Sequence, residues 1–268
     1  MTLKQTKKAA ISAVNFFSKT LSIAEMEVRK LRHDPTELIT RAVQPALWLL
    51  IFGEVFTRVH IIPTGNLSYI SFMAPGILAQ SVLFIAIFYG IAVIWERDLG
   101  ILHKFLVSPT PREALVLGKG LSAGVRALSQ VAIIFALAVL IGVGINWNPI
   151  NLALVAIVAI LASSLFSTFS LIIASLVKTR ERFMGIGQIL TMPLFFASNA
   201  IYPLSMMPNW LQIVARFNPL TYAVDAMRGL MITGGTSIYG VGFDMAVLFV
   251  TTIVLVTIGA KLYPKVIV

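Results

Sequence analysis

Cysteine is absent from this sequence of 268 residues, and histidine occurs only three times. The chain therefore has no disulfide, no thiolate nucleophile and no thiolate metal site. Charged residues make up only 12% of the sequence, against roughly 25% in a soluble domain. The mean hydropathy is +0.90, and 58% of the residues are hydrophobic. This composition excludes a soluble enzyme, a disordered chain and a nucleic-acid-binding protein, and it predicts a membrane protein with several spans.

The sequence motifs of several enzyme classes are also missing. No G-x-x-x-x-G-K-[ST] motif occurs, because Gly118-Lys119 is followed by Gly120 and lacks the upstream glycine, so we expect no ATP site and no bound cofactor in this chain. No H-E-x-x-H metal motif is present. One G-x-S-x-G match, at 120–124, opens an expected membrane helix, and close helix packing explains it better than catalysis does. We therefore expect no catalytic residue and no metal site.

Six stretches of the sequence are apolar enough to cross a bilayer, which takes roughly 20 residues. They are Leu38–Phe56, Tyr69–Trp95, Leu121–Gly144, Asn151–Val177, Phe183–Leu204 and Met245–Ala260. No charged residue occurs from Ala127 to Val177, a run that joins the third and fourth stretches and in which glycines, asparagines and Pro149 between 142 and 149 supply a turn. The predicted fold is an all-α membrane protein with six transmembrane helices in a single domain.

The basic residues predict how these spans are oriented. Of the 21 Lys and Arg residues, 18 fall in segments 1–41, 97–126, 178–182 and 261–265. Because Lys and Arg accumulate on the cytoplasmic side of short loops, these segments and both termini are expected in the cytoplasm of a multi-pass protein in the plasma or inner membrane. An even number of spans leads to the same result.

The segment 1–34, before the first span, has the pattern of an amphipathic helix. Apolar residues recur at spacings of three and four, among them Phe17, Leu21, Val28 and Leu31, with charged residues mostly between them. Such a helix lies in the plane of the membrane interface. It is either a passive anchor or a surface for a cytoplasmic partner.

The cytoplasmic loop 96–119 is longer than a simple connection requires. Residues 96–106 can form a short helix with Leu99 and Leu102 on one face, and 108–111 ends it. Thr110 and Glu113, at capping-box spacing, open a second helix. The two helices are either an amphipathic hairpin that rests on lipid or a docking site for a soluble protein.

Segment 205–235, which the orientation places outside the cell, is apolar but too short in each half to span. Asn218-Pro219 divides it, and Gly234-Gly235 ends it. Two short apolar helices joined in this way predict a re-entrant helical hairpin that dips into the outer leaflet. We therefore expect a cavity or gate near the outer face.

Four uncharged polar residues, Gln80, Gln130, Gln188 and Asn199, fall inside the expected spans. They either form hydrogen bonds between helices or line a path for a bulky amphipathic substrate. Glu54 and Arg58 are one helical turn apart and are expected to pair. No buried carboxylate suggests an ion or proton relay.

Two further segments carry a resemblance to a known family. The loop sequence Glu96-Arg97-Asp98-Leu99-Gly100 and the segment Asn218-Pro219-Leu220-Thr221-Tyr222, followed by residues 223–229, resemble the type-2 ABC exporter permeases. The run 223–229 is most similar to the daunorubicin-resistance branch. The resemblance covers nearly the whole chain.

The resemblance implies partners and roles for particular residues. The permease pairs with a second permease subunit, identical or paralogous, and two separate ABC-type ATPase subunits bind ATP and Mg²⁺ below them. The coupling helix in the loop after the second span corresponds here to Glu96, Arg97, Asp98, Leu99, Gly100, Leu102, Lys104 and Phe105. The outer gate and re-entrant hairpin correspond to Tyr202, Trp210, Asn218, Pro219, Tyr222, Asp225 and Arg228.

The substrate stays open between two classes at this point. A hydrophobic drug or lipid-like molecule is favoured by the 218–229 run, and export of a polysaccharide or lipid-linked glycan is the alternative within the family. Outside the family, an ion-coupled secondary transporter would show internal repeats or intramembrane carboxylates, and neither is evident in the sequence. An intramembrane enzyme ranks third.

Overall fold

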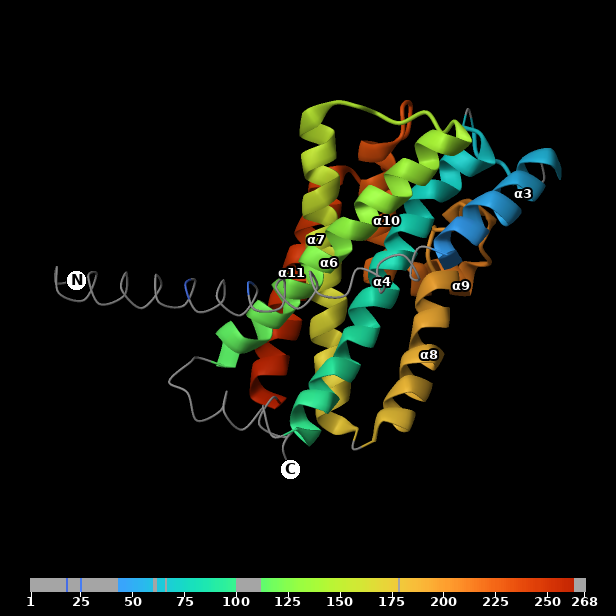
Figure 1. Ribbon diagram of the computed structural model, residues 1–268. Coiled ribbons are helices and arrows are strands. Elements are labelled where there is room, and N and C mark those ends of the chain that lie inside the picture. The colour runs from blue at the N-terminus through green and yellow to red at the C-terminus, as the bar shows by residue number, and fades with distance from the viewer. Residues whose placement is uncertain are drawn as a thin grey trace.

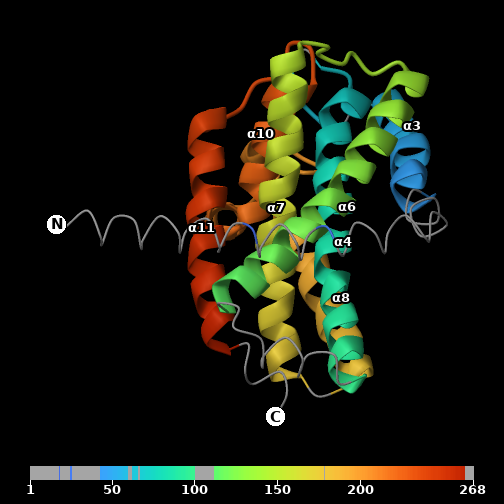
Figure 2. The same ribbon diagram turned by 60° about the vertical axis from the view of Figure 1, so that its left-hand side comes forward.

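The computed structural model is all-helical over the residues that it describes, which are 18, 25, 43–59, 62–65, 67–99, 112–177 and 179–262. Within these ranges no strand forms, and the nearest feature is an isolated antiparallel bridge between Ile145 and Ile232. Long helices pack side by side in a bundle (Figures 1 and 2). The fold class expected from composition, an all-α membrane protein, is confirmed.

Parts of two expected segments lie outside the described residues. The first is the interfacial helix over 1–34, including Phe17, Leu21, Val28 and Leu31; only Ser18 and Glu25, both helical, are described there. The second is the stretch of the cytoplasmic loop that contains Gly100, Leu102, Lys104 and Phe105.

The described helices follow the order of the expected spans. Residues 43–47 are helical and continue into the following elements: the π-helix η1 (Trp48–Gly53), α3 (Glu54–Val59), α4 (Tyr69–Asp98), α6 (Arg112–Ile141), α7 (Pro149–Leu176), α8 (Arg180–Phe196), the short 3₁₀ helix η2 (Leu204–Met206), α9 (Asn209–Phe217), α10 (Pro219–Met231) and α11 (Val241–Leu262). In Figure 1, α4 and α7 end and α8 begins at the lower end of the bundle, while α4, α7 and α11 begin at the upper end.

Four of the described helices, α4, α6, α7 and α11, are long and apolar enough to cross a membrane. The expected first span, of which residues 38–42 lie outside the described ones, corresponds to the described helical stretch 43–59, and the fifth corresponds to α8, which has 17 residues. The total of six spans therefore stays a prediction.

Helix α4 lies at the centre of the bundle and is buried along most of its length. Two of its glycines permit close packing. A Cβ at Gly76 would overlap the backbone of Ala200, and a Cβ at Gly90 would overlap the side chains of Ser170 and Phe183. The Gly90 amide also donates a hydrogen bond of 3.1 Å to Ser170 Oγ on α7. Small residues thus let α7, α8 and the segment after α8 approach α4 closely.

The start of α6 differs from the sequence expectation. The helix begins at Arg112 rather than Leu121, so the second short helix expected in the cytoplasmic loop is the first part of α6. The sequence analysis gave the loop helix and the span from Leu121 as separate elements and did not predict that they are continuous. In the structure, a Cβ at Gly120 would be 3.5 Å from the Ser164 carbonyl oxygen of α7, so packing against α7 keeps the helix continuous.

The end of α8 also differs, because the helix stops at Phe196 and residues 197–200 form a turn, whereas the expected span continues to Leu204. The carbonyls of Leu194 and Ala197 accept hydrogen bonds from Asn218 Nδ2, at 2.7 and 3.0 Å. A side chain from the next segment therefore satisfies carbonyls at the helix end. Both views show α8 beside the lower half of α4 (Figures 1 and 2).

The connections on the upper side follow the expected turn residues. Between α6 and α7, Gly142 has a φ of 83°, and the Asn148 side chain accepts a hydrogen bond of 2.9 Å from the Ile150 amide at the start of α7. The expected pair between Glu54 and Arg58 is also present, at 3.1 Å.

Candidate functional site

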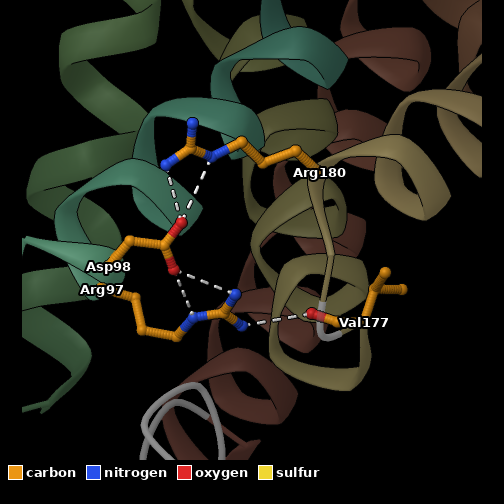
Figure 3. Close-up of polar contacts among 4 residues, drawn as sticks. All are labelled: Arg97, Asp98, Val177 and Arg180. Atoms are coloured by element: carbon orange, nitrogen blue, oxygen red, sulfur yellow. Dashed lines mark hydrogen bonds and ion pairs between the residues drawn. The ribbon is translucent and has the colours of Figure 1, made fainter.

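At the lower end of the bundle, Asp98 in the last turn of α4 holds two arginines (Figure 3). Its Oδ2 accepts hydrogen bonds from Nη2 and Nε of Arg180, at 2.7 and 3.2 Å. Its Oδ1 accepts from Nε and Nη2 of Arg97, both at 3.3 Å, and Arg97 Nη1 donates to the carbonyl of Val177 at 3.3 Å. Because Val177 follows α7 and Arg180 begins α8, these four residues, the lower charged cluster, join the end of α4 to the α7–α8 connection.

The lower charged cluster stays in contact with solvent. The side chains of Asp98 and Arg180 are 37% and 34% exposed. The guanidinium of Arg180 also lies 3.5 Å from the centre of the Trp95 ring, a cation–π contact. Leu99, the next residue of the loop, is 67% exposed. Exposed ion pairs contribute little to stability, so these contacts can rearrange at low cost.

Glu96, two residues before Asp98, is directed into the protein instead. Its Oε2 accepts a hydrogen bond of 2.5 Å from Lys119 Nζ of α6, and the two side chains are 9% and 2% exposed. The sequence analysis did not single out Lys119. A lone lysine that follows the apolar run 114–117 was the available signal.

The described start of the loop that follows α4 is therefore attached to three helices. Glu96 attaches it to α6, while Arg97 and Asp98 attach it to the end of α7 and the start of α8. A force on the loop that follows Leu99 would act on all three contacts.

In the upper half of the bundle, Asp225 of α10 is fully buried and accepts four hydrogen bonds. Its Oδ2 accepts from the amides of Ile238 and Tyr239, at 2.7 and 3.0 Å, and from Ser237 Oγ at 2.9 Å. Its Oδ1 accepts from Asn199 Nδ2 at 3.3 Å. One carboxylate thus holds the loop before α11, and the turn after α8, against α10.

Two more charged residues lie beside Asp225. Arg228 is buried, and its Nη2 donates a hydrogen bond of 2.7 Å to the Asn199 carbonyl. Its Nε and Nη2 also donate to the Phe72 carbonyl, both at 3.3 Å. The guanidinium lies 3.8 Å from the centre of the Phe72 ring. Oδ2 of Asp244, in the first turn of α11, lies 2.8 Å from Ser237 Oγ, so the two carboxylates share the single hydroxyl proton of Ser237. Asn199, Asp225, Arg228, Ser237 and Asp244 together form the upper polar network.

The upper polar network is a hydrogen-bonded cluster. Among the described residues, only Asn199 Oδ1 and Asp244 Oδ1 of this network are buried side-chain atoms without a partner. No group of three His, Cys, Asp or Glu side chains suited to a metal ion occurs anywhere in the described ranges.

Asn218 connects three helices through one side chain. Its Oδ1 accepts a hydrogen bond of 3.0 Å from the Leu220 amide and so caps the start of α10, where Pro219 is the first residue. Its Nδ2 donates to the end of α8, and its own backbone ends α9. The Asn-Pro pair is therefore a three-way junction.

The remaining residues of the expected gate differ in their placement. Tyr222 is buried in α10, and its hydroxyl donates to the Arg216 carbonyl at 2.6 Å. The hydroxyl of Tyr202 donates to the Phe196 carbonyl. Trp210 on α9 is 66% exposed. Asn218, Tyr222, Asp225 and Arg228 thus lie in or at the start of α10, and Trp210 is on the exposed helix beside them.

Two of the four polar residues expected along a path come together. Gln80 of α4 and Gln130 of α6 line one cavity of about 360 Å³, whose described lining is Gln44, Pro45, Gln80, Ser81, Phe84, Ile85, Phe88 and Gln130. Gln188 is exposed on α8, and Asn199 belongs to the upper polar network. Gln44 was missed, although a glutamine before a proline in an expected span was a visible signal.

The comparisons with known proteins indicate one kind of protein. The family described as ABC-2 type transporter matches residues 19–232. The chain is 29% identical over 231 residues to the putative transport permease ycf38 of Cyanophora paradoxa, covering 85% of this chain and 79% of that protein. It is 25% identical over 230 residues to the daunorubicin resistance ABC transporter permease protein DrrB1 of Streptomyces coeruleorubidus (86% and 80%). It is 23% identical over 223 residues to the probable doxorubicin resistance ABC transporter permease protein DrrC of Mycobacterium tuberculosis (82% and 79%).

Proposed function

Because the chain belongs to the ABC-2 type transporter family, we propose that it is the permease subunit of an ATP-driven exporter for a hydrophobic drug or lipid-like molecule. The family assignment makes the chain a membrane permease of ABC type, as distinct from the ATP-binding domain, and implies association with ABC ATPase subunits. Export from the cytoplasm or the inner leaflet is the finer proposal. Two relatives that are named for resistance to daunorubicin and doxorubicin support the substrate class.

The proposed topology has six spans, with both termini and the lower end of the bundle in the cytoplasm. The distribution of Lys and Arg supports it, because 18 of these 21 residues fall in the segments that the topology places inside. Residues 43–59 and α8 would then be the first and fifth spans, and α9 and α10 the re-entrant hairpin of the outer leaflet.

The lower charged cluster is the observation that carries the proposed mechanism. In a working transporter, two ATPase subunits would sit below two permease subunits and contact the segment from Glu96 to Phe105. Closure of the ATPases on ATP would displace that segment. Since Glu96, Arg97 and Asp98 attach its described start to α6, α7 and α8, the displacement would reach three helices at once.

The outer gate is proposed at the Asn218 junction. Movement of α8 would act directly on α9 and α10 there, because the Asn218 side chain contacts the end of α8 and the start of α10. The buried Asp225 and Arg228 would keep α10 attached to α4 and to the loop before α11 while the gate changes shape.

A pull-down from the native membrane tests this function. Detergent-solubilised wild-type protein is expected to retain nucleotide-binding subunits and ATPase activity, and the Leu99→Glu, Leu102→Glu double variant is expected to lose both. Leu140→Glu is the matched control, because Leu140 is 82% exposed near the end of α6, and it should retain the ATPase. A wild-type permease that is recovered alone and inactive would contradict the proposal and favour ion-coupled transport.

A further inference from the structure

We propose that the cavity between residues 43–47, α4 and α6 binds an uncharged amphipathic molecule that carries an apolar ring and a hydroxyl, carbonyl or amide group. The cavity is called here the glutamine cavity, and its described lining is the set of eight residues given above. This inference deepens the proposed function and rests on it, because the bound molecule would be cargo of the exporter.

The main observation is an unpaired amide in the middle of an apolar helix. Gln130 is 0% exposed, and within the described part of the chain neither its Oε1 nor its Nε2 has a hydrogen-bond partner. An unpaired buried amide is unfavourable, and more so at a membrane depth that bulk water does not reach. Polar side chains in membrane helices usually find a partner on a neighbouring helix, and Gln130 has none among the described residues.

Gln80 faces the same cavity from α4. It is 3% exposed and lies, like Gln130, well inside a helix that is long enough to span. Ser81 also lines the cavity, but its hydroxyl already donates a hydrogen bond of 2.8 Å to the Ile77 carbonyl. The amides of Gln80 and Gln130, with that of Gln44 at the opening, are therefore the polar groups that can bind a guest, and each can both donate and accept.

The walls of the cavity indicate the rest of the ligand. Pro45, Ile85 and the rings of Phe84 and Phe88 are apolar, and the centres of these two rings are 6.1 Å apart. Phe84 and Phe88 are half-buried and Gln44 is exposed, so the cavity opens on that side of the described bundle. Its volume of about 360 Å³ falls in the range of ligand sites, which is roughly 300–1,000 Å³.

The charge of the ligand follows from what the described lining contains. None of the eight residues carries a charge. An ion placed there would lose its hydration without gaining a counter-charge, which is costly inside a membrane protein. An uncharged molecule with one polar end therefore fits the cavity better than a cation or an anion does.

Photolabelling of the full chain in lipid nanodiscs tests the site. The probe is an aryl trifluoromethyl diazirine with a benzyl alcohol group, which is uncharged and has a ring and a hydroxyl. Its benzoic acid analogue is the charged comparison. Mass spectrometry of digested protein maps the label, and excess unlabelled benzyl alcohol tests whether labelling is saturable.

Saturable labelling by the alcohol is expected in peptides that contain Pro45, Phe84 or Phe88, and the acid should not label them. Gln130→Leu should reduce this labelling about tenfold, the effect of losing hydrogen bonds in a buried site. The variant should insert and fold, because leucine is apolar and similar in size. Asn151→Leu is the control, because it removes a neutral amide in the first turn of α7, outside the cavity, and it should label like wild type. Labelling that is not saturable, or is equal in Gln130→Leu and wild type, would overturn the site.

The assay contains neither ATP nor an ATPase, so its result is independent of the pull-down. Captured ATPase without saturable labelling would reject the glutamine cavity and leave the proposed function standing. Saturable labelling of a permease that captures no ATPase would keep the site and reject the ATP-driven function.

Discussion

The two ends of the bundle hold the same kinds of residues in opposite surroundings. At the lower end, Asp98 pairs with two arginines while more than a third of its side chain is exposed. In the upper half, Asp225 is fully buried and accepts four hydrogen bonds, with the buried Arg228 beside it. Exposed ion pairs contribute little to stability, whereas removing one member of a buried charged cluster is strongly destabilising. The lower contacts are therefore suited to movement, and the upper contacts to fixing the helices in place.

The largest effect is expected for Asp225→Ala. It leaves the amides of Ile238 and Tyr239 without an acceptor and removes the carboxylate beside the buried Arg228, so the free energy of unfolding should fall by roughly 3–5 kcal/mol. Thermal unfolding in nanodiscs measures the loss, and Asp225→Asn, which keeps one acceptor oxygen, should lose less. An unchanged melting temperature for Asp225→Ala would contradict the claim that the buried upper polar network fixes the helices.

Lys119→Met should cause the next largest loss of stability. It tests whether the burial of an ion pair, or its position at the lower end of the bundle, determines that loss. The variant leaves Glu96 buried without its ammonium partner, although the pair is close to the exposed cluster, and should cost about 3 kcal/mol. Adding Glu96→Gln should restore most of the stability, because two neutral side chains leave no buried charge. If Lys119→Met had the melting temperature of the wild type, burial would not determine how much an ion pair contributes to stability.

Asn218→Ala should destabilise by about 2 kcal/mol, because three hydrogen bonds of the junction are lost. Asn218→Asp keeps the acceptor for the Leu220 amide but cannot donate to the carbonyls of Leu194 and Ala197, so its melting temperature should lie between those of wild type and Asn218→Ala. Equal losses in both variants would show that the contact with α8 is the one that matters.

Asp98→Asn should have the smallest effect on stability and a large effect on ATP-driven transport. Asparagine has no negative charge and cannot pair with both arginines, so the loop loses its attachment to α8. The exposed arginines are solvated instead, and the stability of the fold is therefore kept. The melting temperature should stay at the wild-type value while transport into vesicles falls. Glu54→Gln removes another exposed carboxylate that is paired with an arginine, and it should change neither quantity. A fall in melting temperature as large as that of Asp225→Ala would show that the lower cluster is also a fixed part of the fold.

Much of the fold was predictable from local sequence. Composition indicates a helical membrane protein, and Asn218-Pro219 marks the break between α9 and α10, since asparagine caps helices and proline begins them. The start of α6 was indicated by Thr110 and Glu113 at capping-box spacing, but the continuity of this helix with the span from Leu121 was not predicted. This continuity depends on how Gly120 packs on α7, which is a contact between residues far apart in sequence.

The sites were less predictable because they depend on helix rotation. The sequence marks Gln80, Gln130, Gln188 and Asn199 equally, yet only the first two face one cavity. Likewise, Glu96 and Asp98 are two residues apart, and the helix places one inside the protein and the other at its surface. The partners of such residues come from other helices, whose relative orientation is set by packing along their whole length.

Helix α8 is held by polar contacts at both ends. Its first residue, Arg180, is bound to Asp98, and carbonyls of its last turn are bound to Asn218. A helix of 17 residues is about 25 Å long, at roughly 1.5 Å per residue, and its backbone hydrogen bonds make it stiff along its axis. We therefore expect α8 to link the two sites mechanically, so that a displacement of its first turn at the lower charged cluster is carried to the three-way junction.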